Sequence, residues 1–358
     1  MKTTVLSIVG ARPQFIKLFP LSREVRKHFD EKIIHTGQHF DPEMSDTFFR
    51  ELGIPEPDIN LGINQGGHGD QTGRMLISLE KQMTQLQPDL VIVFGDTNTT
   101  LAGALAAAKL HIPTVHVEAG LRSFNRTMPE EINRVVSDHT ADHLFAPTQS
   151  AIDNLAHEGL QDRTHHTGDI MVDASRAIAH KARQKSSIFT ELDLDGSYML
   201  MTLHRPYNVD DTEKLSLIFR KLGEVDHTIV FPIHPRTRKM VDHHRITIPG
   251  NIRLIRPLGY LDFTSMLVHA EKIITDSGGI QKEAYIHKKP CLTVRPETEW
   301  TETVTDGWNR LIQPGDDNFT GEIRSFRPHT PQSDIFGRDV ARTMVEVIKN
   351  HILTKEKK

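Results

Sequence analysis

Short apolar segments alternate with helix-compatible segments along nearly the whole chain of 358 residues. Apolar runs that end near a turn and precede a helical pattern are typical of parallel strands covered by helices. The expected strands form two series, 5–9, 32–35, 90–94, 114–117 and 143–146 in the first and 198–202, 228–232, 252–254, 272–275 and 291–294 in the second. The alternation predicts an α/β fold with two doubly wound, Rossmann-like domains.

The two series of strands also divide the chain. Because the length exceeds what one hydrophobic core ordinarily serves, we expect two domains, 1–172 and 173–338. The polar, helical segment 174–196 is the expected linker. A last helical segment, 339–351, has apolar residues at helical spacing and is expected to pack back on the first domain. Ligands of such sheets bind beyond the carboxyl ends of the strands, which predicts an active-site cleft between the domains.

The composition argues against several classes of partner. The formal net charge of −4 favours neither nucleic acid nor an anionic membrane. No apolar run reaches the length that crosses a bilayer, and the apolar segment 5–10 is too short for a signal peptide. The single cysteine, Cys291, has no second cysteine to pair with, which is typical of a reducing cytoplasm. Its apolar neighbours indicate a packing role.

The segment 272–284, KIITDSGGIQKEA, predicts a ligand site in the second domain. A short buried strand, a turn with Gly278 and Gly279, and the start of a helix follow one another. Glycines at a helix start let backbone N–H groups approach an anion such as phosphate, which the helix dipole favours. Glu283, one turn further on, can accept hydrogen bonds from sugar hydroxyls. With Ser277 these residues predict a nucleotide site; the alternative is a left-handed turn, which needs only one glycine.

Two cations follow the first expected strand, in the segment GARPQFIK from residue 10 to 17. Pro13 suits the first turn of a helix. Arg12 can contact a diphosphate in a fork geometry and Lys17 as a point charge. The alternative is an ordinary loop between strand and helix with solvated charges.

Acidic residues close two further strands and open a helix. Asp96 follows the strand 90–94, where it can cap the next helix or serve as a catalytic carboxylate. Glu118 ends an apolar strand, and an acid there needs a partner or a function. Glu130 and Glu131 open a helix, where carboxylates favour the dipole, so one of the two can be purely structural. Asp96, Glu118 and Glu130 form a candidate general acid–base set.

Histidines suggest one further site residue and no metal site. His204 ends the first strand of the second domain and can donate to a departing phosphate oxygen; a histidine that caps a loop is the alternative. His139 and His143 are four apart on an expected helix but lack a third ligand at recognisable spacing, and so do His243 and His244. No metal is therefore expected.

Several motifs, taken in order, resemble the non-hydrolysing UDP-N-acetylglucosamine 2-epimerases. They are GARPQFIK, GDTNTTLAG, HVEAGLRS, PEEINR, HR at 204–205, IHP at 233–235 and TDSGGIQKEA. The resemblance implies two Rossmann-like domains in the GT-B arrangement, a UDP-sugar bound between them, and inversion at C2 through elimination and re-addition of UDP. It also implies a homodimeric, cytoplasmic enzyme that serves bacterial surface polysaccharide synthesis without a metal or redox cofactor.

The resemblance assigns a role to each matching residue. The acids that act around C2 of the sugar are matched by Asp96, Glu118 and Glu130, and the histidine that stabilises the departing UDP is matched by His204. Cations of the cleft are matched by Arg12 and Lys17. Contacts to uridine, diphosphate and ribose are matched by Phe263, Ser277, Gly278, Gly279 and Glu283. A second UDP-sugar pocket, for allosteric activation, corresponds to Gln38, His39 and Arg74.

Departures from the family's pattern keep more than one substrate open. The segment HRPYN at 204–208 lacks the glutamate of the usual HRREN, and Trp300 stands where the family has an arginine. With the loop 123–128, these features resemble a branch that acts on UDP-2,3-diacetamido-2,3-dideoxyglucuronate, whose carboxylate Arg126 or Arg205 can meet. A hydrolysing 2-epimerase and a GT-B glycosyltransferase are further alternatives. A UDP-sugar sensor is least favoured, because it has no need of three acids.

Overall fold

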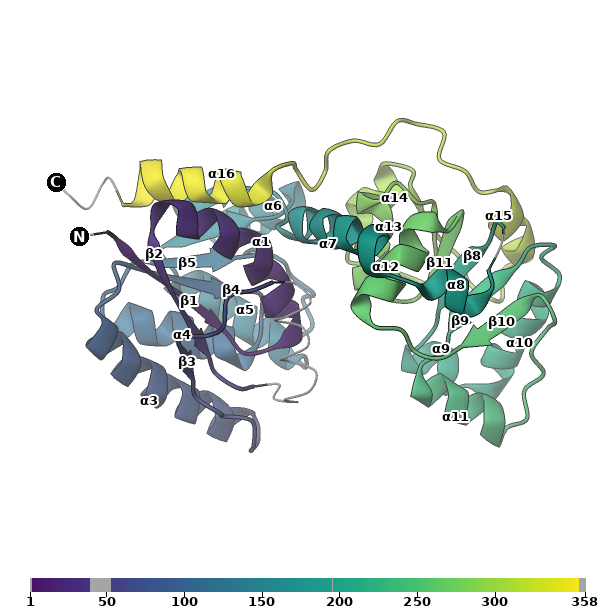
Figure 1. The fold of residues 1–358 in the computed structure, drawn as a ribbon, viewed down its shortest axis with the longest axis horizontal. Coiled ribbons are helices and arrows are strands. Elements are labelled where there is room, and N and C mark those ends of the chain that lie inside the picture. Colours follow the sequence, from purple (N-terminus) through teal and green to yellow (C-terminus); the bar gives the residue numbers. More distant parts are fainter. Residues whose placement is uncertain (1, 39–52, 195, 354–358) are drawn as a thin grey trace. The chain divides into compact units, whose positions relative to one another are not determined.

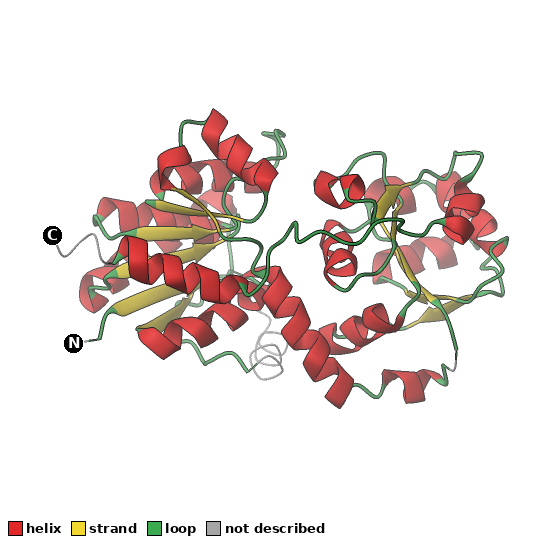
Figure 2. Ribbon diagram, turned by 90° about the horizontal axis from the view of Figure 1, so that it is seen from above, coloured by secondary structure: helices red, strands yellow, loops and turns green. Residues whose placement is uncertain are grey.

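A computed structural model describes residues 2–38, 53–194 and 196–353 of the chain. The chain forms two compact units, Met1–Ala174 with Phe336–Lys358, and Ser175–Ile335. We call them unit 1 and unit 2. Each is built on one parallel sheet with helices on both faces (Figures 1 and 2).

The sheet of unit 1 has seven strands in the order β3-β2-β1-β4-β5-β6-β7. Their bounds are β1 Thr4–Val9, β2 Asp30–His35, β3 Ile59–Asn60, β4 Leu90–Phe94, β5 Thr114–Val117, β6 His143–Ala146 and β7 Thr164–His166. All neighbouring pairs are parallel. Every residue of β4 is buried, because a parallel sheet carries helices on both faces.

Helices of unit 1 connect these strands and cover both faces of the sheet. They are α1 Arg12–His28, α3 His68–Leu86, α4 Asn98–Lys109, α5 Pro129–Thr140, α6 Gln149–His157, the short η1 Gln161–Arg163, α16 Val340–Val347 and η2 Ile348–Ile352. From the other end of the chain, α16 returns to pack beside α1 (Figure 1). The first turn of α16 is capped by the Asp173 carboxylate, which accepts the backbone N–H of Ala341 at 2.7 Å.

Unit 2 has a six-stranded sheet in the order β10-β9-β8-β11-β12-β13. The strands are β8 Met199–Thr202, β9 Ile229–Pro232, β10 Ile252–Ile255, β11 Lys272–Thr275, β12 Cys291–Thr293 and β13 Asn309–Leu311. The helices are α8 Ile188–Leu192, α9 Pro206–Val209, α10 Thr212–Gly223, α11 Pro235–His243, α12 Tyr260–His269, α13 Gly278–Ile286, α14 Thr301–Thr305 and α15 Phe319–Ser325. One more helix, α7 Met171–Lys185, begins in unit 1 and ends in unit 2.

Ten expected strands are present within one residue at each end, except that β2 begins two residues early. The strands that the sequence did not predict are β3, β7 and β13. All three lie at an edge of a sheet, have two or three residues and are partly exposed, so they lack a continuous apolar run. The expected polar linker 174–196 also differs, since it contains α8, whose Ile188 is fully buried in the core of unit 2.

Both sheets reverse their strand order at one point. In unit 1 the chain proceeds outward from β1 through β2 on one side and from β4 through β5 on the other. In unit 2 the corresponding pair is β8 and β11. In open α/β sheets the loops after such a pair separate and leave a crevice in which ligands bind. The loops after β1, β4, β8 and β11 are therefore where binding residues are expected.

Burial agrees with the packing role predicted for Cys291. Its side chain is 1% exposed in the core of unit 2, and burial raises the pKa of the thiol to about 12. A thiol that stays protonated is a poor nucleophile. Within the described residues, no helix has the length and apolar content needed to cross a membrane.

Candidate functional site

A buried glutamine joins the two loops at the reversal point of unit 1. The side-chain oxygen of Gln14 accepts the backbone N–H groups of Gly10 and Ala11 at 2.8 and 3.0 Å. Its nitrogen donates to the carbonyl of Phe94 at 2.9 Å and to the hydroxyl of Thr100 at 3.1 Å. Gln14 thus holds the end of β1 against the end of β4, at the start of α1. Gln14 lies in the segment GARPQFIK, whose spacing gave no signal for this role.

The first candidate acid, Glu118, lies directly after β5 in an unusual backbone conformation. Its φ of 70° is in the left-handed region, which costs a residue with a Cβ free energy and is often associated with function. The carboxylate forms an ion pair with Lys17 of α1, and both side chains are largely buried. The pair lies over Gly95, since a Cβ on that residue would be 3.1 Å from Lys17 and 3.5 Å from Glu118. The sequence predicted that Lys17 contacts a diphosphate, and in the structure its ammonium pairs with the carboxylate of Glu118.

The second candidate acid, Asp96, follows β4 and is next to Gly95. Its carboxylate forms an ion pair with Arg134 of α5, and its backbone carbonyl accepts the side-chain amide of Asn133 at 2.9 Å. The alternative role as a helix cap is wrong, because the N-cap of α4 is Thr97. Asp96 and Glu118 thus follow neighbouring strands, and each carboxylate has a cation beside it.

The two glutamates at the start of α5 differ in burial. Glu131 is 3% exposed and its carboxylate accepts the backbone N–H groups of Ser123 and Phe124, both at 2.9 Å. It also pairs with Arg134 at 3.1 Å. Burial by itself raises the pKa of Glu131, but these hydrogen bonds and the charge of Arg134 outweigh it and hold the pKa below its ordinary value. Glu131 is the structural member of the pair, whereas Glu130 is exposed on the same helix.

Replacing Glu131 by glutamine should destabilise the fold in a pH-dependent way. A carboxylate whose folded-state pKa is lowered contributes stability above its unfolded pKa and loses it as pH falls through the folded value. We expect Glu131→Gln to cost about 2 kcal/mol at neutral pH, and the difference from the wild type to shrink as the solution is acidified. Urea unfolding at a series of pH values measures this.

The matched control is Glu130→Gln, the same change at the neighbouring, exposed position. It removes only a favourable interaction with the helix dipole, so its cost should stay below about 1 kcal/mol. A Glu131→Gln variant whose deficit is unchanged at acid pH would contradict the assignment of an ionised, hydrogen-bonded Glu131.

A buried aspartate organises the reversal point of unit 2. Asp276 follows β11 and is fully buried, and its carboxylate accepts the backbone N–H groups of His204 at 3.1 Å and Arg205 at 3.0 Å. It also accepts the side-chain amide of Asn208 at 3.1 Å. The loops after β8 and β11 are therefore joined through one carboxylate. In the sequence Asp276 is one residue of the turn before the two glycines, and no pattern there signals this role.

The candidate catalytic histidine, His204, lies beside this carboxylate. Its Nδ1 is 3.5 Å from Asp276 and the side chain is 38% exposed. Burial lowers the pKa of His204, and the nearby charges of Arg205 and His234 lower it further, against the opposing effect of Asp276. The imidazole is therefore neutral near pH 7 and carries one N–H that it can donate.

The two glycines that follow β11 are not explained by a left-handed turn. Neither Gly278 nor Gly279 has a positive φ, so that alternative is wrong. Gly278 lies against Glu299, whose carboxylate oxygen would be 2.0 Å from an added Cβ. At Gly279 an added Cβ would meet no atom within 4 Å. The first turn of α13 therefore presents its backbone to open space at Gly279, as close approach of a ligand requires.

The remaining residues predicted for this site surround α13. Glu283 is 8% exposed and accepts the hydroxyl of Tyr260 at 2.9 Å. Phe263, one turn further along α12, is half-buried against the core of unit 2. Trp300, where the family has an arginine, is buried, and the ammonium of Lys282 lies 4.4 Å from the centre of its ring. A cation therefore accompanies the tryptophan.

Histidines that suggested a metal site are engaged otherwise. His139 is on α5 and lies 3.1 Å from Glu158, whereas His143 begins β6 and lies 3.3 Å from His165. The expected helical spacing between His139 and His143 is therefore wrong. Among the described residues, no group of three or more histidine, cysteine, aspartate or glutamate side chains could hold a metal ion.

Residues matched to an allosteric pocket lie in unit 1. The side-chain oxygen of Gln38 accepts the backbone N–H and the hydroxyl of Thr99 at 2.9 and 2.8 Å, at the start of α4. Arg74 of α3 forms an ion pair with Asp70 at 2.5 Å. His39 lies outside the described residues.

Proteins of known family resemble this chain over nearly its whole length. The family model of the UDP-N-acetylglucosamine 2-epimerases matches residues 23–349. A protein of Methanococcus maripaludis, described as a UDP-N-acetylglucosamine 2-epimerase homolog, is 48% identical over 354 residues, which are 97% of this chain and 99% of that protein. The UDP-2,3-diacetamido-2,3-dideoxy-D-glucuronate 2-epimerase of Pseudomonas aeruginosa is 45% identical over 338 residues, 92% of this chain and 94% of that protein.

Solved structures of UDP-GlcNAc 2-epimerases also align with this chain over nearly its whole length. The UDP-GlcNAc 2-epimerase of Methanocaldococcus jannaschii aligns with a TM-score of 0.89 and 41% identity, over 97% of this chain and 99% of that chain. Its complex with UDP-GlcNAc and UDP aligns over the same shares with a TM-score of 0.80. The predicted fold class, α/β with two Rossmann-like domains of the GT-B type, is confirmed, and the protein is an isomerase. The chain belongs to the UDP-N-acetylglucosamine 2-epimerase family.

Proposed function

We propose that this protein inverts C2 of a UDP-N-acetylhexosamine and so interconverts UDP-N-acetylglucosamine and UDP-N-acetylmannosamine. The observation that carries the proposal is the pair of carboxylates, Asp96 and Glu118, at the ends of neighbouring strands with a cation beside each. Inversion at carbon needs one group to remove a proton and another to deliver one to the opposite face. The M. jannaschii relative was solved with UDP-GlcNAc and UDP, which supports a substrate of this class.

Unit 2 supplies the groups that bind UDP in this proposal. The first turn of α13, from Ser277 through Gly279, binds the diphosphate with its backbone N–H groups and the helix dipole. Glu283, already held by Tyr260, accepts hydrogen bonds from the ribose hydroxyls. Phe263 stacks on the base. Arg12 of unit 1 adds a permanently charged guanidinium for the phosphates. It is exposed at the first turn of α1.

The proposed chemistry begins at the anomeric carbon. The C2 hydrogen of a sugar is not next to a carbonyl, so it becomes acidic only as the C1–O bond to UDP weakens. A carboxylate among Asp96, Glu118 and Glu130 removes this proton, the electron pair forms the C1–C2 double bond of a glycal, and UDP leaves with the bonding pair of the C1–O bond. The neutral His204 donates a hydrogen bond to the departing phosphate oxygen.

Re-addition completes the proposed cycle. A second carboxyl group, which carries a proton, delivers it to the other face of C2 and becomes a carboxylate. The electron pair of the C1–C2 double bond forms the new C2–H bond, and a phosphate oxygen of UDP bonds to C1 to restore the anomeric bond. Lys17 forms an ion pair with Glu118 and Arg134 forms one with Asp96, so a cation holds each carboxyl group in place. The product of the forward reaction would supply surface polysaccharide synthesis.

A second substrate is favoured by particular side chains. The side-chain Nε of Arg205 is buried and has no hydrogen-bond partner among the described residues, so it suits an anionic group of a ligand. Trp300, which stands where the family has an arginine, has the cation of Lys282 beside its ring. UDP-2,3-diacetamido-2,3-dideoxyglucuronate carries a carboxylate on its sugar, and the P. aeruginosa relative is named for that substrate. We retain this uronate as the alternative substrate.

Assembly and regulation belong to the same proposal. We expect a homodimer and a second UDP-sugar pocket that activates the enzyme, with Gln38, His39 and Arg74 as its residues. The contact of Gln38 with Thr99 supports a link to the catalytic loops, because Thr99 is three residues after Asp96. No metal or redox cofactor takes part.

Proton NMR of the protein with UDP-N-acetylglucosamine in D2O tests the function. The expected result is UDP-N-acetylmannosamine with deuterium at C2. Free UDP with free sugar would favour a hydrolysing enzyme, and turnover only with an added acceptor would favour a glycosyltransferase. Exchange with the diacetamido-uronate nucleotide alone would identify the alternative substrate. If the protein binds UDP-sugars but exchanges no C2 hydrogen for deuterium, it is a UDP-sugar sensor and the proposal is overturned.

A further inference from the structure

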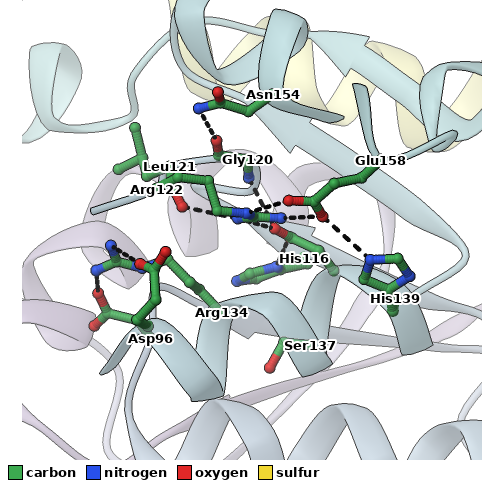
Figure 3. Close-up of polar contacts among 12 residues, drawn as sticks. Asp96, His116, Gly120, Leu121, Arg122, Arg134, Ser137, His139, Asn154 and Glu158 are labelled. Carbon is green, nitrogen blue, oxygen red and sulfur yellow. Dashed lines mark hydrogen bonds and ion pairs between the residues drawn. The ribbon is translucent and has the colours of Figure 1, made fainter. Parts of the chain in front are cut away.

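A group of buried charged side chains in unit 1 contacts the loops that carry the candidate acids Asp96 and Glu118. His116 of β5 and Asp138 of α5 are fully buried, and Arg122 is almost so. Asp138 accepts from His116 at 2.7 Å and from Arg122 at 2.7 Å. Arg122 turns its other nitrogens to Glu158, at 2.7 and 2.8 Å (Figure 3). The proposed chemistry uses none of these residues.

Both ring nitrogens of His116 face oxygen atoms that accept hydrogen bonds. Nδ1 is 2.7 Å from a carboxylate oxygen of Asp138, and Nε2 is 2.6 Å from the backbone carbonyl of Gly95. A carbonyl has no proton to donate, so Nε2 must carry one. A ring with that proton alone would place a nitrogen lone pair against the carboxylate. The short contacts on both sides are those of a ring that carries both protons.

The acids around Arg122 differ in burial. Asp138 is fully buried beside the guanidinium, whereas the carboxylate of Glu158 is 27% exposed and is solvated in part. Burial by itself raises the pKa of Asp138, but His116 and Arg122 outweigh it and hold that pKa below its ordinary value. Asp138 is therefore ionised, and its carboxylate can accept a hydrogen bond from each neighbour. His139 of α5 lies beyond Glu158 at 3.1 Å.

The same pair of side chains reaches the backbone on which both candidate acids are carried. Gly95, next to Asp96, donates its N–H to the carbonyl of Val117 at 2.9 Å, and its own carbonyl accepts from Nε2 of His116. Two residues beyond Glu118, the N–H of Gly120 donates to Asp138 at 3.1 Å. Gly95 and Gly120 both have positive φ values, and so has Glu118 between strand and turn. The pair of His116 and Asp138 thus supports both loops, and the loop after β5 includes Glu118 with its left-handed backbone.

We propose that His116, held as an imidazolium by Asp138, is a positioning residue that fixes the backbone carrying Asp96 and Glu118 for proton transfer at C2. This inference rests on the proposed function. His116 touches no substrate, because its ring is fully buried. Its contribution is orientation: small displacements of a general base reduce the rate steeply while binding of the rest of the substrate persists.

The protonation state of the ring is tested on the unmodified protein. Nitrogen-15 NMR of histidine-labelled protein at neutral pH should show one buried ring with protons on both nitrogens, slow to exchange with solvent. The signals should be missing from His116→Gln. A buried ring assigned to His116 with an unprotonated nitrogen would overturn the proposal. Asp138→Asn keeps the ring but removes its counter-charge, so in that variant one ring nitrogen should lose its proton.

Kinetics then separate positioning from simple packing. In His116→Gln, kcat for epimerisation should fall on the order of 10²-fold. The dissociation constant of UDP should remain within about threefold of the wild-type value, since His116 is not among the residues proposed to contact UDP. Asp138→Asn should show the same division. A kcat within about threefold of wild type, or an equal loss of UDP binding and rate, would refute the positioning role.

The matched control is His165→Gln on β7. That histidine is a partly buried imidazole in the same sheet, two strands from β5, and it pairs with His143. Its replacement should leave kcat unchanged. Failure of the proposed function remains distinguishable: a wild-type protein that does not epimerise its substrate overturns the function, whereas an active wild type with an equally active His116→Gln variant overturns only this inference.

Discussion

Asp96→Asn should reduce epimerisation about 10³-fold while the affinity for UDP stays within about threefold. The amide has nearly the shape of the carboxylate, but it cannot take up a proton from C2. Arg134 would lose one partner and keep the other, Glu131 at 3.1 Å, so the loop after β4 should stay in place. Incorporation of deuterium at C2 in D2O, with UDP binding by calorimetry, measures both quantities.

An aspartate at the opposite end of the same strand provides the control. Asp89 precedes β4 and accepts the backbone N–H of Thr4 at 2.7 Å. Asp89→Asn makes the same chemical change far from the carboxyl ends of the strands, so its turnover should equal that of the wild type. Full activity of Asp96→Asn would remove Asp96 from the proton transfer. An equal loss in both variants would point to damaged folding of the strand.

Asp276→Ala should produce the largest loss of stability among the site variants. The carboxylate is fully buried and accepts from two backbone N–H groups and the amide of Asn208. Without it these donors are buried with no partner, and each such group costs about 1–3 kcal/mol. We expect unfolding in urea to show a deficit of about 4 kcal/mol, and UDP binding to weaken because His204 and the turn before α13 lose their common support.

Asp210→Ala is the control in unit 2. Asp210 is exposed and its ion-pair partner, Arg236, is also exposed, so its removal should cost less than about 1 kcal/mol. Asp276→Asn should lie between the two, because the amide retains one accepting oxygen. A stability deficit for Asp276→Ala no larger than that of Asp210→Ala would show that the carboxylate does not hold these loops together.

Much of the fold could be predicted from the sequence because the central strands are completely buried. In a parallel sheet covered on both faces, a central strand such as β4 is apolar throughout, and turn residues mark its ends. β11 is equally buried and has an apolar centre, Ile273 and Ile274, between Lys272 and Thr275. Edge strands obey no such rule. β3, β7 and β13 consist of two or three partly exposed residues, and only pairing with a neighbour makes them strands.

Candidate site residues could be predicted from motifs, but their contacts could not. Chain position placed Asp96 and Glu118 at strand ends, since carboxyl ends of parallel strands share one edge. The partner of Glu118, Lys17, is 101 residues away in sequence, and spacing contains no signal for such a pair. The choice between Glu130 and Glu131 depended on which carboxylate is buried under the loop at Ser123.

The sequence by itself determined the α/β class, the central strands and the loops that carry polar residues, because these depend on local apolar patterns and on turn chemistry. The tertiary structure decided which charges meet. Asp276 appeared in the sequence as one residue of a tight turn, yet it joins two loops of unit 2. His116 appeared as part of a strand, yet its ring meets Asp138 and Gly95 at once. Hydrogen bonds and ion pairs of this kind depend on distance in space, which only folding brings about.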